Sequence, residues 1–137
     1  MGRDRRRDTA MGAPVVHFEI LGADPAGLRA FYGGLFGWEF QVGDAATAQV
    51  SRPGGYGFVR QGAAEIAGGV GGGDGFGPRV LFYVGVDDVE AALARAESLG
   101  GTRRMGPEPR TGGDFCVGWF ADPEGNVVGV AGPPVVG

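Results

Sequence analysis

The sequence is short of several features that mark particular classes of protein. Its 137 residues include one cysteine, Cys116, which excludes an internal disulfide. The net charge of −4 provides no electrostatic basis for binding nucleic acid. The arginine-rich start of the chain is followed by no apolar run, so it resembles neither a signal peptide nor a membrane anchor. We therefore expect a cytoplasmic protein with no nucleic-acid partner and no membrane partner.

Lysine is absent as well, because all 12 basic residues are arginines. Four of these arginines lie between residues 3 and 7, next to Asp4 and Asp8. Charged chain ends of this kind are usually disordered. We therefore predict a disordered leader over residues 1–14, in which translation could begin at Met1 or at Met11.

Glycine, in contrast, is abundant, with 30 residues that gather in short clusters such as 54–55, 68–69 and 71–73. Clusters of this kind indicate loops and tight turns between short elements rather than a fibrous repeat. A chain of this length is large enough for one hydrophobic core and too small for two. We expect a single domain over residues 15–131, followed by a short tail over residues 132–137.

An internal repeat organises this domain. Residues 15–40 and 79–104 stand 64 positions apart, and each stretch reads as a strand, an acidic turn, an amphipathic helix and a glycine exit toward a second strand. The offset aligns His17 with Leu81 and Glu19 with Tyr83. Further strand patterns follow each copy. We predict an α+β fold of two βαβββ modules, over about residues 15–70 and 79–131.

The first module begins with alternation over residues 15–21, which places Val16 on one strand face and both His17 and Glu19 on the other. The two helices should begin at Asp24-Pro25 and at Asp87-Asp88, and end at Gly37 and at Gly100-Gly101. Their buried faces should comprise Leu28, Phe31, Tyr32 and Leu35 in the first helix, and Val89, Ala92, Leu93, Ala96 and Leu99 in the second. The remaining strands are expected at about residues 38–42, 56–61, 63–70, 80–86, 102–105, 115–121 and 127–130.

Four motifs, in this order, are similar to those of the vicinal oxygen chelate superfamily, which includes glyoxalase I, extradiol dioxygenases and bleomycin-binding resistance proteins. The motifs are HFEI at 17–20, AFYGGLFGW at 30–38, VDDVEAALARAESLGG at 86–101 and FADPEGNVVGV at 120–130. The resemblance implies paired half-barrels whose concave sheet faces form a cavity for a small-molecule ligand, with the helices outside. It also implies a homodimer.

Members of this superfamily that use a metal place His, Glu or Gln ligands on the first and last strands of each half. His17 matches one of these positions, but Leu81 and Gly129 at two others cannot bind a metal, and the fourth falls near Glu65. Catalytic metals are usually held by at least three protein ligands. We therefore favour no metal cofactor; the alternative is a divalent metal held by His17 and Glu65.

The candidate catalytic residues are His17, Glu19 and Tyr83. His17 and Glu19 share a strand face, so that an imidazole and a carboxylate could act on one ligand as an acid/base pair, and the repeat brings Tyr83 to the other side of the same cavity. A purely structural role is the alternative, with His17 hydrogen-bonded to a neighbouring strand and Glu19 paired with an arginine such as Arg60 or Arg79.

The candidate ligand-binding residues are four aromatic side chains, at least half of which could instead belong to the core: Trp38, Phe58, Phe115 and Trp119. These residues favour a metal-independent binding protein that sequesters, or confers resistance to, an aromatic natural product. The alternative is a glyoxalase-, lyase/isomerase- or dioxygenase-like enzyme that uses His17 and Glu19, with or without a divalent metal. A small accessory domain without chemistry is the third possibility.

Overall fold

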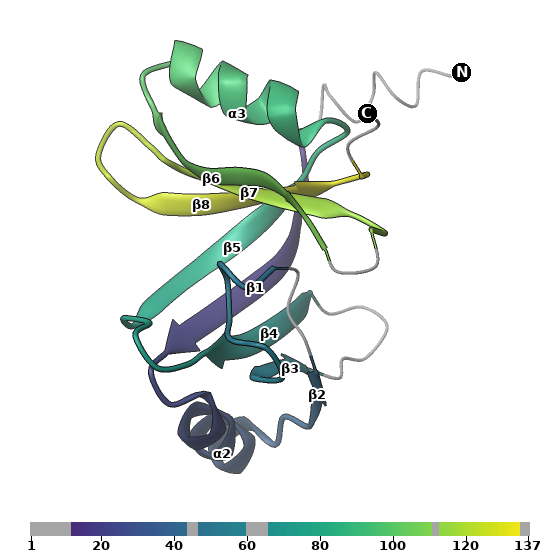
Figure 1. Ribbon diagram of the computed structural model, residues 1–137, viewed down its shortest axis with the longest axis vertical. Helices are drawn as coiled ribbons and strands as arrows, with labels where there is room; N and C mark the ends of the chain where they lie inside the picture. The colour runs from purple at the N-terminus through teal and green to yellow at the C-terminus, as the bar shows by residue number, and fades with distance from the viewer. Residues whose placement is uncertain (1–11, 44–46, 60–65, 111–112, 135–137) are drawn as a thin grey trace.

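The computed structural model describes residues 12–43, 47–59, 66–110 and 113–134. The first half of the chain contains β1 (Val15–Gly22), α2 (Pro25–Phe36), β2 (Phe40–Gly43), β3 (Tyr56–Val59) and β4 (Ala67–Gly72). The second half contains β5 (Arg79–Gly85), α3 (Val89–Ser98), β6 (Thr102–Pro109), β7 (Cys116–Ala121) and β8 (Val127–Gly132). The predicted α+β fold of two βαβββ modules is confirmed (Figure 1).

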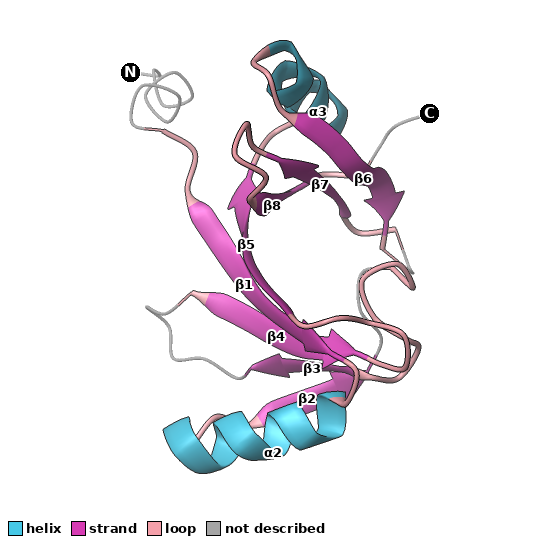
Figure 2. Ribbon diagram, turned by 90° about the vertical axis from the view of Figure 1, so that its left-hand side faces the viewer, coloured by secondary structure: helices cyan, strands magenta, loops and turns pink. Residues whose placement is uncertain are grey.

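The strands form one eight-stranded sheet in the order β2-β3-β4-β1-β5-β8-β7-β6. The two modules meet where β1 and β5 pair antiparallel, with Phe18 opposite Phe82. In each module the first strand also pairs in parallel with the last, β1 with β4 and β5 with β8. The sheet is strongly curved, and both helices lie on its outer side (Figure 2). Both halves of the concave surface therefore come from the same chain.

The helix ends follow the sequence predictions. The carboxylate of Asp24 accepts a hydrogen bond from the Gly27 amide at 3.0 Å, and that of Asp88 accepts one from the Ala91 amide at 2.9 Å, as N-caps do. Gly37 ends α2 in the left-handed region, with φ of 73°. None of the described helices is long and apolar enough to cross a membrane.

The buried face predicted for α2 is right for Leu28 and Tyr32 and wrong for Phe31 and Leu35. No residue of this helix is fully buried, and both Phe31 and Leu35 are 59% exposed. The helix turns Leu28 and Tyr32 toward the sheet together with Arg29, whose guanidinium donates a hydrogen bond to the Gly55 carbonyl at 2.9 Å. Spacing identifies which residues share a helix face, but not which part of that face the neighbouring strands cover.

The second helix matches its prediction more closely. Val89 and Leu93 are buried against β7 and β8, together with Cys116 and Val130. Cys116 is therefore a core residue. Leu99 follows the end of α3 and is 64% exposed, so its predicted burial is wrong.

Several strands differ in length from the predictions. The predicted end of β6 lies at about residue 105, but the strand continues through Pro107 to Pro109. It is the last strand of the sheet, and prolines are tolerated there because one side of an edge strand needs no hydrogen-bond donors. Strand β4 is described from Ala67, and the earlier part of its predicted range lies outside the described residues.

Candidate ligand-binding cavity

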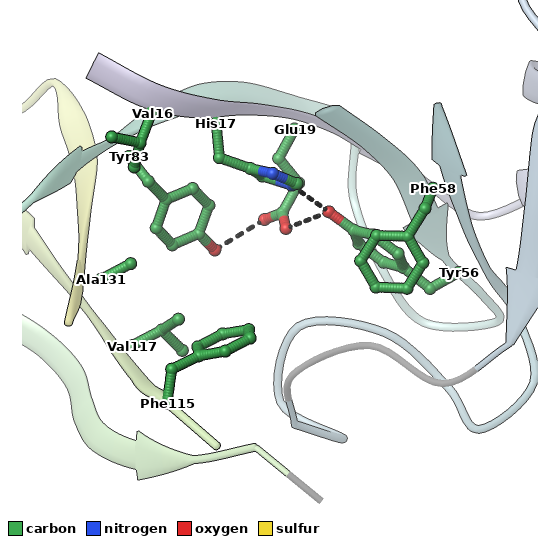
Figure 3. Close-up of a pocket in the computed structure, with 9 residues that line it drawn as sticks. All are labelled: Val16, His17, Glu19, Tyr56, Phe58, Tyr83, Phe115, Val117 and Ala131. Carbon is green, nitrogen blue, oxygen red and sulfur yellow. Dashed lines mark hydrogen bonds between the residues drawn. The ribbon is translucent and has the colours of Figure 1, made fainter. Parts of the chain in front are cut away.

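The concave side of the sheet contains a cavity of about 210 Å³ (Figure 3). Pockets for drug-sized ligands usually measure about 300–1,000 Å³, so this cavity suits a small molecule. Its lining comes from strands of both modules and consists of Val16, His17, Glu19, Tyr56, Phe58, Tyr83, Phe115, Val117 and Ala131. The structure therefore brings together His17, Glu19 and Tyr83, which the sequence singled out, with two of the four predicted aromatic residues.

The other two predicted aromatic residues lie elsewhere. Trp119 does not line the cavity, but its indole donates a hydrogen bond to the Tyr83 hydroxyl at 2.7 Å. Trp38 belongs to an aromatic cluster beside α2, where its ring lies 5.2 Å from that of Phe18 and 5.8 Å from that of Tyr32. The alternation that places His17 in the cavity puts Phe18 on the opposite strand face, so Trp38 does not share the cavity.

Glu19 is the chemical centre of the cavity. Its side chain is only 2% exposed, and each carboxylate oxygen accepts a hydrogen bond from a tyrosine hydroxyl. Tyr56 donates to Oε1 at 2.8 Å and Tyr83 donates to Oε2 at 2.9 Å. Within the described part of the chain, no arginine forms an ion pair with Glu19. The predicted alternative of an Arg79 partner is wrong, because this guanidinium stacks over Trp119 at 5.0 Å; Arg60 lies outside the described residues.

Two further residues extend this network outward from the tyrosines. His17 Nε2 lies 2.9 Å from the Tyr56 hydroxyl oxygen. Because Tyr56 has a single hydroxyl proton, directed to Glu19, the contact assigns a proton to Nε2 of His17, which donates to Tyr56. On the other side, Trp119 donates to Tyr83 and Tyr83 donates to Glu19. All four hydrogen bonds thus run toward one carboxylate.

Burial controls the ionisation of these groups. It raises the pKa of Glu19 to about 7, although the hydrogen bonds from Tyr56 and Tyr83 act in the opposite direction. It lowers the pKa of His17 to about 4, so the imidazole is neutral at neutral pH. Burial and the adjacent Glu19 carboxylate raise the pKa of both tyrosines above the ordinary value, which keeps the phenols protonated. Glu19 therefore exchanges its proton close to neutral pH.

Two glycines make room for the tyrosine rings. Gly69 on β4 is paired with Glu19, and Gly129 on β8 is paired with Tyr83. A Cβ atom at Gly69 would overlap the ring of Tyr56, and one at Gly129 would overlap the ring of Tyr83. The rings thus occupy the space that side chains of β4 and β8 would otherwise fill.

The same glycines bear on the metal site that the superfamily implies. The last strand of the second half carries Gly129 at the position expected for a ligand, and β4 presents Ala67 and Gly69 opposite His17 and Glu19. The described ranges contain no group of three His, Cys, Asp or Glu side chains able to hold a metal ion. Glu65 lies outside the described residues. The donors that the structure describes do not fit a catalytic divalent metal, for which three protein ligands are usual.

The sequence does not predict two features of the cavity. Tyr56 is not among the predicted site residues, because nothing in the sequence indicates that its hydroxyl reaches Glu19 across the intervening strand β4. Val16 was expected on the face opposite His17, but it lines the cavity because the pairing of β1 with β5 is shifted between Val15 and His17. A bulge of this kind turns a side chain to the other face, and the alternating pattern carries no sign of it.

The curved sheet of paired βαβββ modules, with a cavity on its concave side, defines a glyoxalase-type fold. A family model described as a glyoxalase-like domain matches residues 15–131, so the chain belongs to this family. The predicted membership of the glyoxalase, bleomycin-resistance and dioxygenase superfamily is confirmed. A search of curated proteins finds no match.

Solved structures share the fold at low sequence identity. A hypothetical protein from Bacillus halodurans C-125 superposes with a TM-score of 0.64 at 13% identity, over 92% of this chain and 98% of that one. Methylmalonyl-CoA epimerase from Mycobacterium tuberculosis gives 0.59 at 17% identity, over 88% of each chain. The Mn(II)-bound glyoxalase from Novosphingobium aromaticivorans gives 0.59 at 20% identity, over 90% of this chain and 42% of that one. At these identities the similarity establishes the fold alone.

Proposed function

We propose that this protein is a metal-independent enzyme of the lyase or isomerase type, in which Glu19 moves a proton to or from a small ligand in the cavity. The observation that carries the proposal is the position of the Glu19 carboxylate, which is buried, lines the cavity and has no cationic partner among the described residues. A general base or acid works best when its pKa lies near the working pH. With a pKa of about 7, Glu19 meets this condition.

The cost of burying Glu19 supports an active role over a structural one. Removing a carboxylate from water without a counterion costs several kcal/mol, even after hydrogen bonds compensate part of the loss. A core built only for stability would be better served by a neutral side chain of the same shape. Buried groups with strongly shifted pKa values are concentrated at functional sites. The cavity at Glu19 is therefore the place where we expect the chemistry.

The proposed reaction class is proton transfer at a carbon next to a carbonyl group. A carboxylate of this pKa can accept such a proton and return it to the same or a neighbouring atom, which produces isomerisation, epimerisation or elimination. His17 is neutral near neutral pH and bonded to Tyr56, so it is not the primary base. Tyr83 holds the carboxylate from the other side and is expected to position it.

The test is hydrogen–deuterium exchange on candidate substrates. The protein would be incubated in D2O with a panel of small carbonyl compounds with an acidic C–H bond, such as 2-oxo acids, hydroxy ketones and thioesters. Loss of the C–H signal in proton NMR reports the exchange. We expect at least one compound to exchange with the wild type, and Glu19→Gln to lower its rate at least 100-fold. Exchange at equal rates in both proteins would refute the proposal, and so would a panel without exchange.

A second function is supported by the apolar lining of the cavity. Phe58, Phe115 and Val117 give it an apolar wall, and the Arg110 guanidinium stacks over both phenylalanine rings at 5.8 and 5.4 Å. A binding protein that sequesters an aromatic compound would use such a wall for stacking. In that case Glu19→Gln would leave binding of the aromatic ligand almost unchanged, because no charge acts on the ligand.

We also propose that the protein forms a homodimer through the outer face of α2. Phe31, Leu35 and Phe36 expose an apolar strip there, with exposed fractions of 59%, 59% and 57%. Apolar strips of adjacent large side chains commonly mark contact surfaces. The dimers implied by the superfamily resemblance support a second copy of the chain as the occupant.

A further inference from the structure

The two hydrogen-bonded arms that meet at Glu19 end in different chemical groups. One arm runs from His17 through Tyr56 to Oε1, and the other runs from Trp119 through Tyr83 to Oε2. Their similar lengths, between 2.7 and 2.9 Å, make them look equivalent. They are not, because the terminal groups differ in what they can donate and accept (Figure 3 shows the His17 arm and Tyr83).

The indole of Trp119 can only donate a hydrogen bond, whereas a neutral imidazole carries one donor nitrogen and one acceptor nitrogen. Tyr83 must therefore keep its own proton directed at Glu19, because Trp119 offers no acceptor for that proton. The Tyr56 hydroxyl can point either to Glu19 or to His17, provided that His17 Nε2 is free of its proton. Only the His17 arm can reverse its direction.

We propose that Tyr56 and His17 form a proton relay that charges and discharges Glu19, while Trp119 and Tyr83 form a fixed anchor for the carboxylate. This inference rests on the proposed role of Glu19 in proton transfer. It assigns a direction to the network: protons pass between the carboxylate and the Nδ1 atom of His17, which makes no hydrogen bond with the described residues and belongs to a partly exposed side chain.

The transfer balances with one proton. A proton binds at Nδ1 of His17, and Nε2 gives its own proton to the Tyr56 oxygen as Tyr56 gives its proton to Oε1 of Glu19. The product is a neutral glutamic acid that donates to Tyr56, a tyrosine that donates to Nε2, and a histidine with its proton on Nδ1. Discharge runs in reverse. Each passage therefore changes the tautomer of His17, and no side chain has to change its rotamer.

Few other charges face this relay. Of the other groups in the hydrogen-bonded network, Tyr83 from β5 and Trp119 from β7 are uncharged, and two arginines reach only the surrounding rings. Arg79 lies over Trp119, and Arg110, paired with Asp114 at 3.0 Å, lies over Phe58 and Phe115. No described acidic or basic side chain besides Glu19 bonds to the relay atoms, so the charge of Glu19 controls the orientation of Tyr56.

The test reads the tautomer of His17 by nitrogen-15 NMR. The chain contains one histidine, so the ring signals need no assignment. In the wild type near pH 8 we expect the proton on Nε2. In Glu19→Gln the amide oxygen must face Tyr83, because the Tyr83 proton has no other acceptor in the network, and the amide NH2 must then face Tyr56. Tyr56 consequently donates to His17, and the proton of His17 moves to Nδ1. The same tautomer in both proteins would overturn the relay.

A variant-free measurement covers the case in which Glu19→Gln fails to fold. Lowering the pH of the wild type from about 8 to about 5.5 protonates Glu19, whose pKa is about 7, but not His17, whose pKa is about 4. The tautomer should change from Nε2–H to Nδ1–H over this range, and a constant tautomer would contradict the relay. Tyr56→Phe serves as the control and should abolish the change.

The relay and the proposed function can fail separately. A change of tautomer in a protein that exchanges no substrate proton would leave the relay intact and remove its use in catalysis. Exchange that depends on Glu19, together with a fixed tautomer, would support the enzyme and refute the relay.

Discussion

The pKa values of Glu19 and His17 shift in opposite directions on folding, and these shifts predict an unusual dependence of stability on pH. A carboxyl group whose pKa rises from 4.5 to about 7 on folding holds its proton in the folded state after the unfolded chain has lost it. Its ionisation therefore lowers the free energy of unfolding as the pH increases from about 4.5 to 7. His17, whose pKa falls from 6.5 to about 4, has the reverse effect and increases the free energy of unfolding from about pH 4 to 6.5.

The two contributions are nearly equal in size. At about 1.4 kcal/mol per pKa unit, each corresponds to about 3 kcal/mol. Between about pH 4.5 and 6.5 the two contributions cancel in the wild type. Glu19 and His17 together therefore change the free energy of unfolding little over this range. Glu19→Gln leaves only the histidine contribution, and the free energy of unfolding should increase by about 3 kcal/mol from pH 4 to 6.5 relative to the wild type. His17→Gln should show the opposite slope, with a decrease of about 3 kcal/mol from pH 4.5 to 7.

The assay is urea unfolding followed by far-ultraviolet circular dichroism at half-unit pH intervals. Glu39→Gln is the matched control, because Glu39 is exposed and its substitution should leave the wild-type profile unchanged. The double variant His17→Gln/Glu19→Gln should have the same slope as the wild type over the window of cancellation. Parallel profiles for the wild type and Glu19→Gln would refute the argument, because they would mean that Glu19 ionises alike in the folded and unfolded chains.

The remaining predictions concern the glycine at the cavity and the exposed face of α2. Gly129→Ala should lower the free energy of unfolding by about 1–3 kcal/mol, because the new methyl group overlaps the ring of Tyr83. Gly77→Ala, where the added methyl group meets open space, should lower it far less. Equal urea midpoints for the two variants would contradict this prediction. Leu35→Glu should convert the proposed dimer into monomers in light scattering, while Leu99→Glu, at an exposed leucine next to the other helix, should leave it intact. A dimer that survives Leu35→Glu would rule out the α2 face.

The repeat in the sequence was sufficient to predict the arrangement of the fold. The 64-residue offset pairs Glu19 with Tyr83, and the structure brings these two residues into direct contact at 2.9 Å. The prediction succeeded because a duplicated module places equivalent strand positions around a common axis. The same alignment identified Leu81 and Gly129 as residues unable to bind a metal, and the structure shows that Gly129 instead accommodates the Tyr83 ring.

The partners of the buried groups could not be predicted in the same way. The contact between Tyr56 and Glu19 depends on the curvature of the sheet and on the absence of a side chain at Gly69, and neither follows from local spacing. Trp38 was wrongly predicted to line the cavity, whereas it packs against Phe18. Composition indicates that an aromatic side chain is packed, but not on which face of the sheet. The exposure of Phe31 depends likewise on how far the neighbouring strands extend.

The close approach of Tyr83 to Gly129 also limits how this cavity can change by mutation. A side chain can appear at position 129 only when the ring at position 83 becomes smaller, and a smaller residue at position 83 leaves an empty space above a glycine. Either change alone is costly, whereas the two together exchange one wall of the cavity for another. Such coupling between contacting positions is a form of epistasis. A site in which a tyrosine holds the Glu19 carboxylate and a site with functional side chains on β8 therefore differ at both positions 83 and 129. Variants that differ at only one of these positions should be selected against.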